Sequence, residues 1–495
     1  MILPGRLGCA LACVAIAAGA AARDAPPATD DPALEHARGL LRECRPLEAA
    51  EAFAQILAQR PDDERAIAGR IESWIDADRW NAALAEVTAL GERARVRVAL
   101  ASAAGAALFR AGHIAEAGDV LGPHADSSEL AARGLSVLGA VRLAEGRSTE
   151  AVDLMRRALA ADPDDPRVVL RAAEATTSRK EAVERLARYL EIGERDDADR
   201  REGARGTLEG LRALGERSVW RLEAAPTRLE LPLGPLVGPE GDPIAWTVTA
   251  RLGAKRHAAR LLLDTGSGGL FLTDRVARRA GFEALAQETA FGGGGAGRHR
   301  SARGLLPALG LGDLRFLDAL VTTTPVEIDP TGRYQGILGP GLFEGYRVTL
   351  DLHDGVLRLE RGGEGLTHGV AYWVVAGQIL VRAFARGGPD GLFLLDTGAT
   401  ASVLDLDYVA QIPGAKLSER ALSRGYGGTI PGARRVENVQ IELLGRATRG
   451  RDLVAADLST RSRLGGVEIV GYVGMDLLGG AVLVLDPLAR RLDLR

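Results

Sequence analysis

The chain has 495 residues, of which 46% are hydrophobic and 26% charged, and its formal net charge is −4. This length predicts two to four domains, and the ordinary composition indicates a soluble globular protein. The small negative charge, with no basic block, argues against a nucleic-acid partner and against a basic membrane-binding surface.

The N-terminal segment differs in composition from the rest of the chain. Arg6 precedes an apolar run over residues 7–21, which is shorter than the ~20 residues that span a bilayer comfortably. Small residues up to Ala22 suit a signal peptidase, so we expect residues 1–22 to be a signal peptide that directs export to the periplasm or to the medium. An uncleaved membrane anchor is the alternative. Removal of this segment leaves Cys44 as the one cysteine, so the mature chain forms no internal disulfide.

A helical domain is expected over residues 23–216, because apolar residues recur at three- and four-residue spacing from about 32 to 214. Two segments match, EAAEAFAQILAQRPDD at 48–63 and EAVDLMRRALAADPDD at 150–165, and their prolines lie 102 residues apart, three times 34. This period and the Pro-Asp-Asp ending resemble the tetratricopeptide repeat family over roughly residues 32–195. The resemblance implies a short solenoid of about five helical hairpins whose concave face binds a protein partner. A helical scaffold without a partner is the alternative.

The composition and the hydrophobic pattern change around residues 218–235, where helix-forming residues are replaced by short alternating runs rich in Thr, Val, Gly and Pro. Turn signals then recur every 8–12 residues to the end of the chain, which indicates mostly β structure. We divide this part into two lobes, residues 217–367 and 368–495, because each contains one copy of the motif described next.

Two matching segments carry the strongest signal. RLLLDTGS at 260–267 and LFLLDTGA at 392–399 each end an apolar strand with Asp-Thr-Gly and a small residue. A Gly-rich segment, an apolar-apolar-Gly segment and a pair of strands follow each copy in the same order. Burying an aspartate at the end of an apolar run is costly without a purpose, and here it occurs twice. A duplicated β-barrel that keeps Asp-Thr-Gly as a turn is the alternative.

Residues 225–495 therefore resemble the pepsin/retropepsin group of aspartic proteases, with both lobes in one chain. The resemblance implies an all-β bilobal acid-protease domain that needs no dimerisation. It implies an endopeptidase in which Asp264 and Asp396 activate a water for attack on a peptide or protein substrate. The residues implied to support the active-site loops are Thr265, Gly266, Ser267, Thr397, Gly398 and Ala399. Those implied to form two substrate-covering flaps are Gly293, Gly294, Gly295, Tyr426, Gly427 and Gly428.

The chemistry requires two carboxyl groups for a physical reason. Carboxylates held about 3 Å apart cannot both ionise, so the pair shares one proton and supplies a base and an acid. Ser267 can donate a hydrogen bond to Asp264, whereas Ala399 cannot do so for Asp396. We therefore expect Asp264 to be the more readily ionised member of the pair.

Other motifs do not extend this interpretation. Gly292, Gly294 and Gly297 match G-x-G-x-x-G but lack the βαβ context of a dinucleotide site, and no P-loop is present. The seven histidines show no metal-ligand spacing, so we expect neither metal nor cofactor. A competing hypothesis is a catalytically silent peptide-binding or assembly protein that uses the helical array for recognition.

Overall fold

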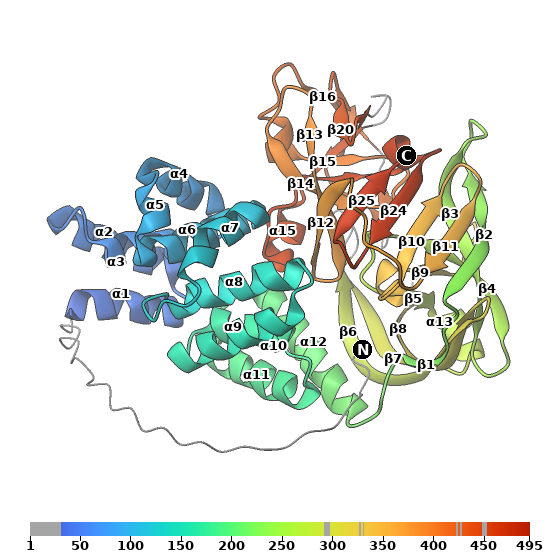
Figure 1. Cartoon of the computed structure of the whole chain (residues 1–495), viewed down its shortest axis with the longest axis horizontal. Coiled ribbons are helices and arrows are strands. Elements are labelled where there is room, and N and C mark those ends of the chain that lie inside the picture. Colours follow the sequence, from blue (N-terminus) through green and yellow to red (C-terminus); the bar gives the residue numbers. More distant parts are fainter. Residues whose placement is uncertain are drawn as a thin grey trace.

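The computed structural model describes residues 31–291, 298–325, 328–329, 331–421, 424–425, 428–447 and 453–495. Helices form the N-terminal part of the molecule and strands the C-terminal part, and the two lie side by side (Figure 1). The expected order of a helical region followed by a β-rich domain is therefore confirmed. The predicted signal peptide lies outside the described residues. Within them, no helix has the length and apolar character needed to cross a membrane.

The helical domain consists of hairpins in which each helix packs against the next. Its helices are α1 (Pro32–Arg42), α2 (Pro46–Gln59), α3 (Glu64–Asp76), α4 (Trp80–Leu90), α5 (Arg93–Val96), α6 (Val98–Arg110), α7 (Ile114–Leu121), α8 (Ala132–Ala144), α9 (Ser148–Ala161), α10 (Pro166–Ala175), α11 (Arg179–Ile192) and α12 (Ala198–Leu214). Asp63 and Asp165 begin α3 and α10 by accepting backbone N–H groups. Gly69 of α3 admits the ring of Phe53, because a Cβ there would lie 2.2 Å from it. The tetratricopeptide resemblance stays a prediction.

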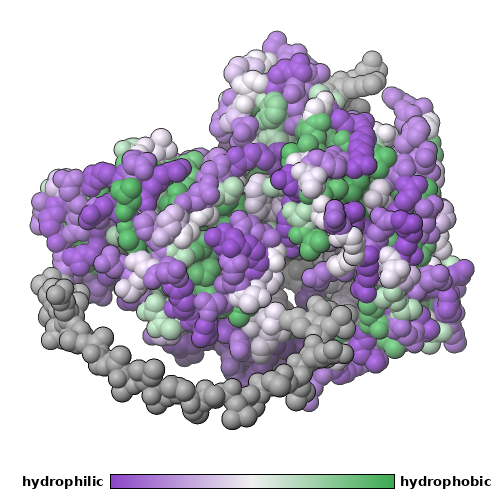
Figure 2. Space-filling model, viewed as in Figure 1, coloured by the Kyte–Doolittle hydropathy of each residue, from purple (hydrophilic) through white to green (hydrophobic). Residues whose placement is uncertain are grey.

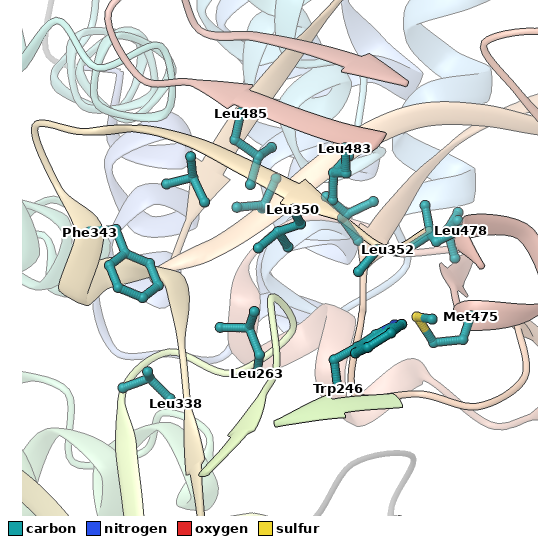
Figure 3. Close-up of a cluster of buried hydrophobic side chains, with 14 of the residues drawn as sticks. Trp246, Leu263, Leu338, Phe343, Leu350, Leu352, Met475, Leu478, Leu483 and Leu485 are labelled. Atoms are coloured by element: carbon teal, nitrogen blue, oxygen red, sulfur yellow. The ribbon is translucent and has the colours of Figure 1, made fainter. Parts of the chain in front are cut away.

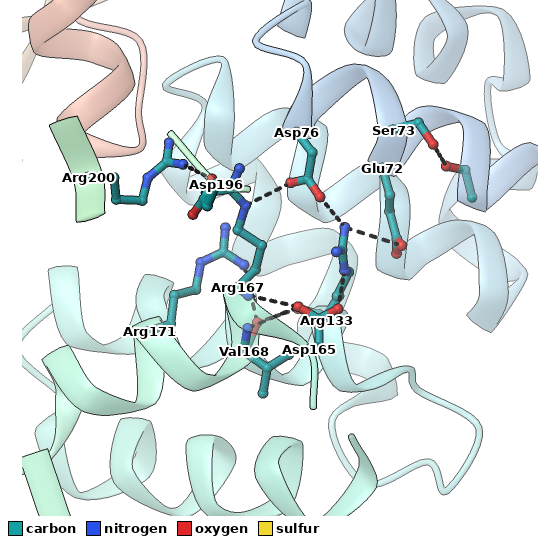
Figure 4. A network of polar contacts seen from close by, with 12 residues as sticks. Glu72, Ser73, Asp76, Arg133, Asp165, Arg167, Val168, Arg171, Asp196 and Arg200 are labelled. Carbon is teal, nitrogen blue, oxygen red and sulfur yellow. Dashed lines mark hydrogen bonds and ion pairs between the residues drawn. The ribbon is translucent and has the colours of Figure 1, made fainter. Parts of the chain in front are cut away.

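Buried charged side chains from α3, α8 and α10, and from the connections before α10 and α12, lie together inside the helical domain (Figure 4). Arg133 of α8 contacts Asp76 at 2.8 Å and Asp165 at 2.6 Å. Arg167 of α10 contacts Asp76 at 3.1 Å and Asp196 at 3.2 Å. Burial raises the pKa of Asp76, but the charges of Arg133 and Arg167 outweigh burial and lower it to about 2. This set of five residues, called the ion network below, therefore consists of compensated charges.

The outer surface of the helical domain differs from this interior. Figure 2 shows that hydrophilic side chains cover most of the visible face, with apolar side chains in separate patches. Several exposed arginines pair with acids one helical turn away, as Arg147 does with Glu150 and Arg156 with Asp153. Such exposed pairs contribute little to stability.

The first lobe is built from strands and one short α-helix. They are β1 (Arg221–Ala224), β2 (Arg228–Val237), β3 (Pro243–Leu252), β4 (His257–Leu263), β5 (Leu270–Thr273), α13 (Asp274–Arg279), β6 (Glu283–Phe291), β7 (Arg298–Leu311), β8 (Leu314–Thr324), β9 (Gly336–Leu338), β10 (Arg347–Asp351) and β11 (Val356–Glu360). In the middle of this lobe β9 runs parallel to β4 and antiparallel to β5.

The second lobe repeats this plan. Its elements are β12 (Val370–Val375), β13 (Gln378–Ala385), β14 (Asp390–Leu395), β15 (Val403–Asp405), α14 (Leu406–Val409), β16 (Lys416–Arg420), β17 (Arg424–Gly425), β18 (Gly428–Thr429), β19 (Arg434–Glu437), β20 (Ile441–Leu443), β21 (Arg446–Ala447), β22 (Val454–Ala456), α15 (Ser459–Gly465), β23 (Gly471–Val473), α16 (Met475–Leu478), β24 (Val482–Asp486) and β25 (Arg491–Leu494). Here β23 runs parallel to β14 and antiparallel to β15, as β9 does in the first lobe.

One sheet joins the two lobes. Its strands follow the order β2-β11-β10-β24-β25-β12, with β10 and β24 antiparallel at the centre. Leu350 pairs with Leu483 across that junction, and both side chains are buried in a cluster that includes Leu263 and Leu338 (Figure 3). Leu263 immediately precedes Asp264, so this shared core fixes the strand that carries the first carboxyl group.

The helical domain and the second lobe also share a hydrophobic core. Phe109, Ile114 and Leu138 from the helices belong to one buried cluster with Leu392 and Tyr472 from the β-rich domain. Two ion pairs flank this cluster, one joining Arg110 to Glu468 at 3.0 Å and the other joining Arg382 to Glu116 at 2.8 Å. The helical domain is therefore packed onto the second lobe through an apolar interface.

Candidate active site

Both Asp-Thr-Gly loops are held from below by the central strand of their own lobe. The backbone N–H of Asp264 donates to the carbonyl of Leu338 in β9, and that of Asp396 donates to Val473 in β23, each at 3.0 Å. Gly339 follows β9 directly, and a Cβ there would lie 2.3 Å from the carbonyl oxygen of Ser267. The apolar-apolar-Gly segment thus lies against its loop because glycine leaves room for the loop backbone.

The two loops are joined to each other by their threonines. The Thr265 hydroxyl donates to the carbonyl of Leu395 at 2.7 Å and accepts the N–H of Thr397 at 3.0 Å. The Thr397 hydroxyl donates to the carbonyl of Leu263 at 2.8 Å and accepts the N–H of Thr265 at 3.1 Å. All of these groups are buried, so each hydroxyl satisfies backbone groups of the opposite lobe and fixes the distance between the loops.

Glycine is required beside each threonine because the carboxyl group of the other lobe approaches there. A Cβ on Gly266 would lie 2.8 Å from Cγ of Asp396, and a Cβ on Gly398 would lie 2.7 Å from Cγ of Asp264. Each glycine N–H also donates to the carboxylate of its own loop, at 2.8 Å for Asp264 and 3.0 Å for Asp396. In each Asp-Thr-Gly loop, Asp therefore supplies the carboxyl group, Thr supplies the hydrogen bonds to the other lobe, and Gly leaves room for the opposite carboxyl group.

The carboxyl groups of Asp264 and Asp396 form a hydrogen bond with each other. Protein atoms surround both groups, yet each residue keeps part of its surface accessible to solvent. Burial, followed by the negative charge of Asp396, raises the pKa of Asp264 well above its usual range. Burial also raises the pKa of Asp396. The pair therefore shares a proton in the pH range where an ordinary carboxyl group has lost its own.

The hydrogen-bond donors around the two carboxyl groups differ from those that we expected. The Ser267 hydroxyl is directed at the carbonyl of Gly269 (3.4 Å), and it makes no hydrogen bond to Asp264 in the described part of the chain. In the second lobe the backbone N–H of Ala399 donates to Asp396 at 3.0 Å, in addition to the N–H of Gly398. Asp396 thus accepts one more backbone N–H than Asp264, which favours its ionised form. The hydrogen bond that we expected from Ser267 to Asp264 is not formed, and a comparison of side chains alone does not include the backbone N–H of Ala399.

Two side chains of the second lobe reach across to the first loop, and the sequence interpretation missed both. Gln378 Nε2 donates to the carbonyl oxygen of Gly266 at 3.0 Å, and Arg461 Nη2 donates to the same oxygen at 3.3 Å. Gln378 begins β13 and Arg461 lies in α15, far from either motif in sequence. Neither has a local signal, because only the packing of the lobes brings them to this oxygen.

The predicted flap residues divide between described and undescribed parts of the chain. Gly293, Gly294, Gly295, Tyr426 and Gly427 lie outside the described residues. Gly428 begins β18 and pairs with Gly425. In the first lobe, β6 and β7 form a long hairpin whose last described pair is Phe291 and Arg298.

Outside the carboxyl pair, the described residues form neither a metal site nor an activated thiol. Among the described residues, no three His, Cys, Asp or Glu side chains are grouped so that they could hold a metal ion. Cys44 is free and partly buried, and burial, together with the charge of Asp196, raises the pKa of its thiol to about 11. Such a thiol is a poor nucleophile at neutral pH.

Comparison with known proteins agrees with this geometry. Residues 248–340 match the family model of the aspartyl proteases. An aspartic proteinase from Irpex lacteus is similar in structure, with 14% identity and a TM-score of 0.33, over 54% of this chain and 96% of that chain. No curated protein matches the sequence. The matched segment contains Asp264, its loop and β9, and the chain thus contains an aspartic protease-like domain.

Proposed function

We propose that the chain is an aspartic endopeptidase whose base and acid are the carboxyl groups of Asp396 and Asp264. The observation that carries this proposal is the hydrogen bond between the two carboxyl groups, braced symmetrically by Thr265 and Thr397. Two carboxyl groups held together at a cost in free energy are expected where they serve chemistry.

The arrangement supports hydrolysis by an activated water. The ionised Asp396 accepts a proton from the water, and the water oxygen attacks the carbonyl carbon of the peptide bond. Asp264 donates its proton to the carbonyl oxygen. The tetrahedral intermediate then breaks its C–N bond. The leaving nitrogen takes the proton held by Asp396, and one hydroxyl of the intermediate returns a proton to Asp264, which restores the pair. The β6–β7 hairpin and the β17–β18 hairpin are the segments that we expect to close over an extended peptide.

Both carboxyl groups come from one chain, so a single copy suffices for this reaction. We also retain export as part of the proposal, on the composition of residues 1–22. The helical domain is proposed to present a protein partner or substrate to the β-rich domain onto which it packs.

Cleavage of a mixed peptide library by the purified full chain tests the proposal. Asp264→Asn and Asp396→Asn should each reduce the rate about 10³-fold or more, because each removes one member of the acid–base pair. Asp313→Asn, an exposed aspartate in the turn between β7 and β8, is the matched control and should keep the wild-type rate. Equal rates for the wild type and both dyad variants would leave the silent peptide-binding protein as the better interpretation.

A further inference from the structure

Arg461 is a partly buried cation beside the carboxyl pair that the proposed reaction does not itself use. Its Nη2 donates to Gly266, two residues after Asp264. Its Nε is buried and has no hydrogen-bond partner among the described residues. Cζ lies 6.0 Å from the centroid of the Tyr472 ring. Among the described residues, a guanidinium group held in this way has a neutral carbonyl as its acceptor and lacks the carboxylate partner that buried arginines normally have.

The carboxyl pair supplies the missing negative charge. The charge of Arg461 acts on both Asp264 and Asp396 and lowers the pKa of each, against the larger effect of burial. The other described ionisable group facing the pair is Tyr334, in the loop before β9. Burial, then the charge of Asp329, raises the pKa of Tyr334 to about 12, so it is neutral at working pH. Arg461 is therefore the cation that balances the single negative charge of the pair.

The helical domain holds the helix that carries this arginine. Arg463, two residues further along α15, forms ion pairs with Asp197 and Asp199 at the start of α12, the latter at 2.9 Å. In Figure 1 α15 lies between the helical domain and strands of the second lobe. An ion pair on each of two acids restrains α15 more than a single exposed pair does.

The same helix, α12, also packs along β6 of the first flap hairpin. Small residues allow the approach: a Cβ on Gly206 would lie 3.6 Å from Cβ of Glu288, and one on Gly210 would lie 3.7 Å from Cδ of Arg303. Glu288 in turn pairs with Arg303 at 3.2 Å. One helix of the helical domain thus contacts both a flap strand of the first lobe and the arginine-bearing helix of the second.

We propose that Arg461 is a positioning residue that favours ionisation of the Asp264/Asp396 pair, and that α12 of the helical domain keeps it there through Arg463. This inference rests on the proposed endopeptidase function. It gives the helical domain a part in the active site in addition to any partner that it binds. It also explains why α15 carries two arginines on the same segment, one toward the loop and one toward α12.

The pH dependence of kcat/KM of the full chain tests it. Arg461→Gln removes a charge that favours both ionisations of the pair, so both limbs of the profile should move upward by about one pH unit. Arg461→Lys keeps the charge and should restore most of the wild-type profile. Arg463→Gln should move both limbs in the same direction by a smaller amount. Arg386→Gln, an exposed arginine of the second lobe paired with Glu442, is the control and should move neither limb.

Each outcome decides one part of the inference. Unmoved limbs in Arg461→Gln, or an equal shift in Arg461→Lys, would overturn the electrostatic role, and an unmoved profile in Arg463→Gln would overturn the role of α12. If the wild type shows no hydrolysis, the endopeptidase function fails. An NMR titration of 13C-labelled aspartate carboxyls then still decides the inference, because Arg461→Gln should raise the apparent pKa values of the pair, and this measurement needs no substrate. The same titration serves if Arg461→Gln is too unstable for kinetics, with Arg463→Gln as the variant.

Discussion

Two of the places where the molecule buries charge differ in the sign of the pKa shift. In the helical domain, Asp76 lies between Arg133 and Arg167, so each charge faces an opposite one. In the β-rich domain, Asp264 faces Asp396, and Arg461 donates to the backbone of the first loop. Burial opposes charge at both sites, yet the pKa falls in the first and rises in the second.

The direction of the pKa shift distinguishes a buried cluster of opposite charges from a buried pair of carboxyl groups. Buried charges that compensate each other cost little once formed and leave no group poised to exchange a proton. Two buried carboxyl groups that face each other must hold a proton between them, and such a pair persists only where the surrounding structure enforces it. Here the threonine hydroxyls and the central strands supply that enforcement.

Removing one arginine of the ion network should have the largest effect on stability. Arg133→Met leaves Asp76 and Asp165 without their shared partner, which should lower the free energy of unfolding by about 3–5 kcal/mol. Urea unfolding followed by far-ultraviolet circular dichroism measures it. A loss below about 1 kcal/mol would show that the network is not compensated in the way that we describe.

Breaking the brace at the carboxyl pair should cost less. Thr397→Val keeps the shape but removes the bonds to the carbonyl of Leu263 and the N–H of Thr265, so about 1–3 kcal/mol should be lost. Thr265→Val removes the matching bonds in the other direction and should have a similar effect. A cost at one position only, measured by the same unfolding experiment, would contradict the symmetry of the brace.

The two clusters should respond to pH with opposite signs. The pKa of Asp76 is lowered in the folded state, so its contribution of about 2 kcal/mol is present above pH 4 and is lost as the pH falls toward 2. The pKa of Asp264 is raised, so its contribution is present below pH 4 and is lost as the pH rises through its folded value.

Unfolding free energies of the wild type, Asp76→Asn and Asp264→Asn between pH 2.5 and pH 7 separate the two signs. The advantage of the wild type over Asp76→Asn should shrink as the pH falls. The unfolding free energy of Asp264→Asn should increase relative to that of the wild type as the pH rises. Parallel curves for both variants would mean that the two clusters do not differ in electrostatic character.

The smallest effect is expected at an exposed pair of the same helical domain. Arg156→Met breaks the pair with Asp153, whose side chains are 74% and 49% exposed, and should change the free energy of unfolding by less than about 1 kcal/mol. This variant is the matched control for Arg133→Met, because it makes the same substitution where water can replace the partner. An effect as large as that of Arg133→Met would remove burial as the explanation.

Much of the candidate active site was determined locally by the sequence. Three apolar residues before Asp264 and four before Asp396 dictate buried strands, and the glycine two positions later is the residue that the opposite carboxyl group tolerates. The change from three- and four-residue periodicity to short alternating runs likewise predicted helices to about residue 214 and mostly β structure from around residues 218–235. In the structure α12 ends at Leu214 and β1 begins at Arg221. These features are local because propensity and burial pattern act over a few residues.

Only the tertiary structure decided which backbone donors and which side chains surround each carboxyl group of the pair. Ala399 acts through its backbone N–H, and Arg461 and Gln378 reach Gly266 from 195 and 112 residues away. Arg133 likewise contacts Asp76, from which it is separated by 57 positions in sequence. Electrostatic energy depends on distance in space and on solvent exclusion, and neither quantity is written in the order of residues along a chain.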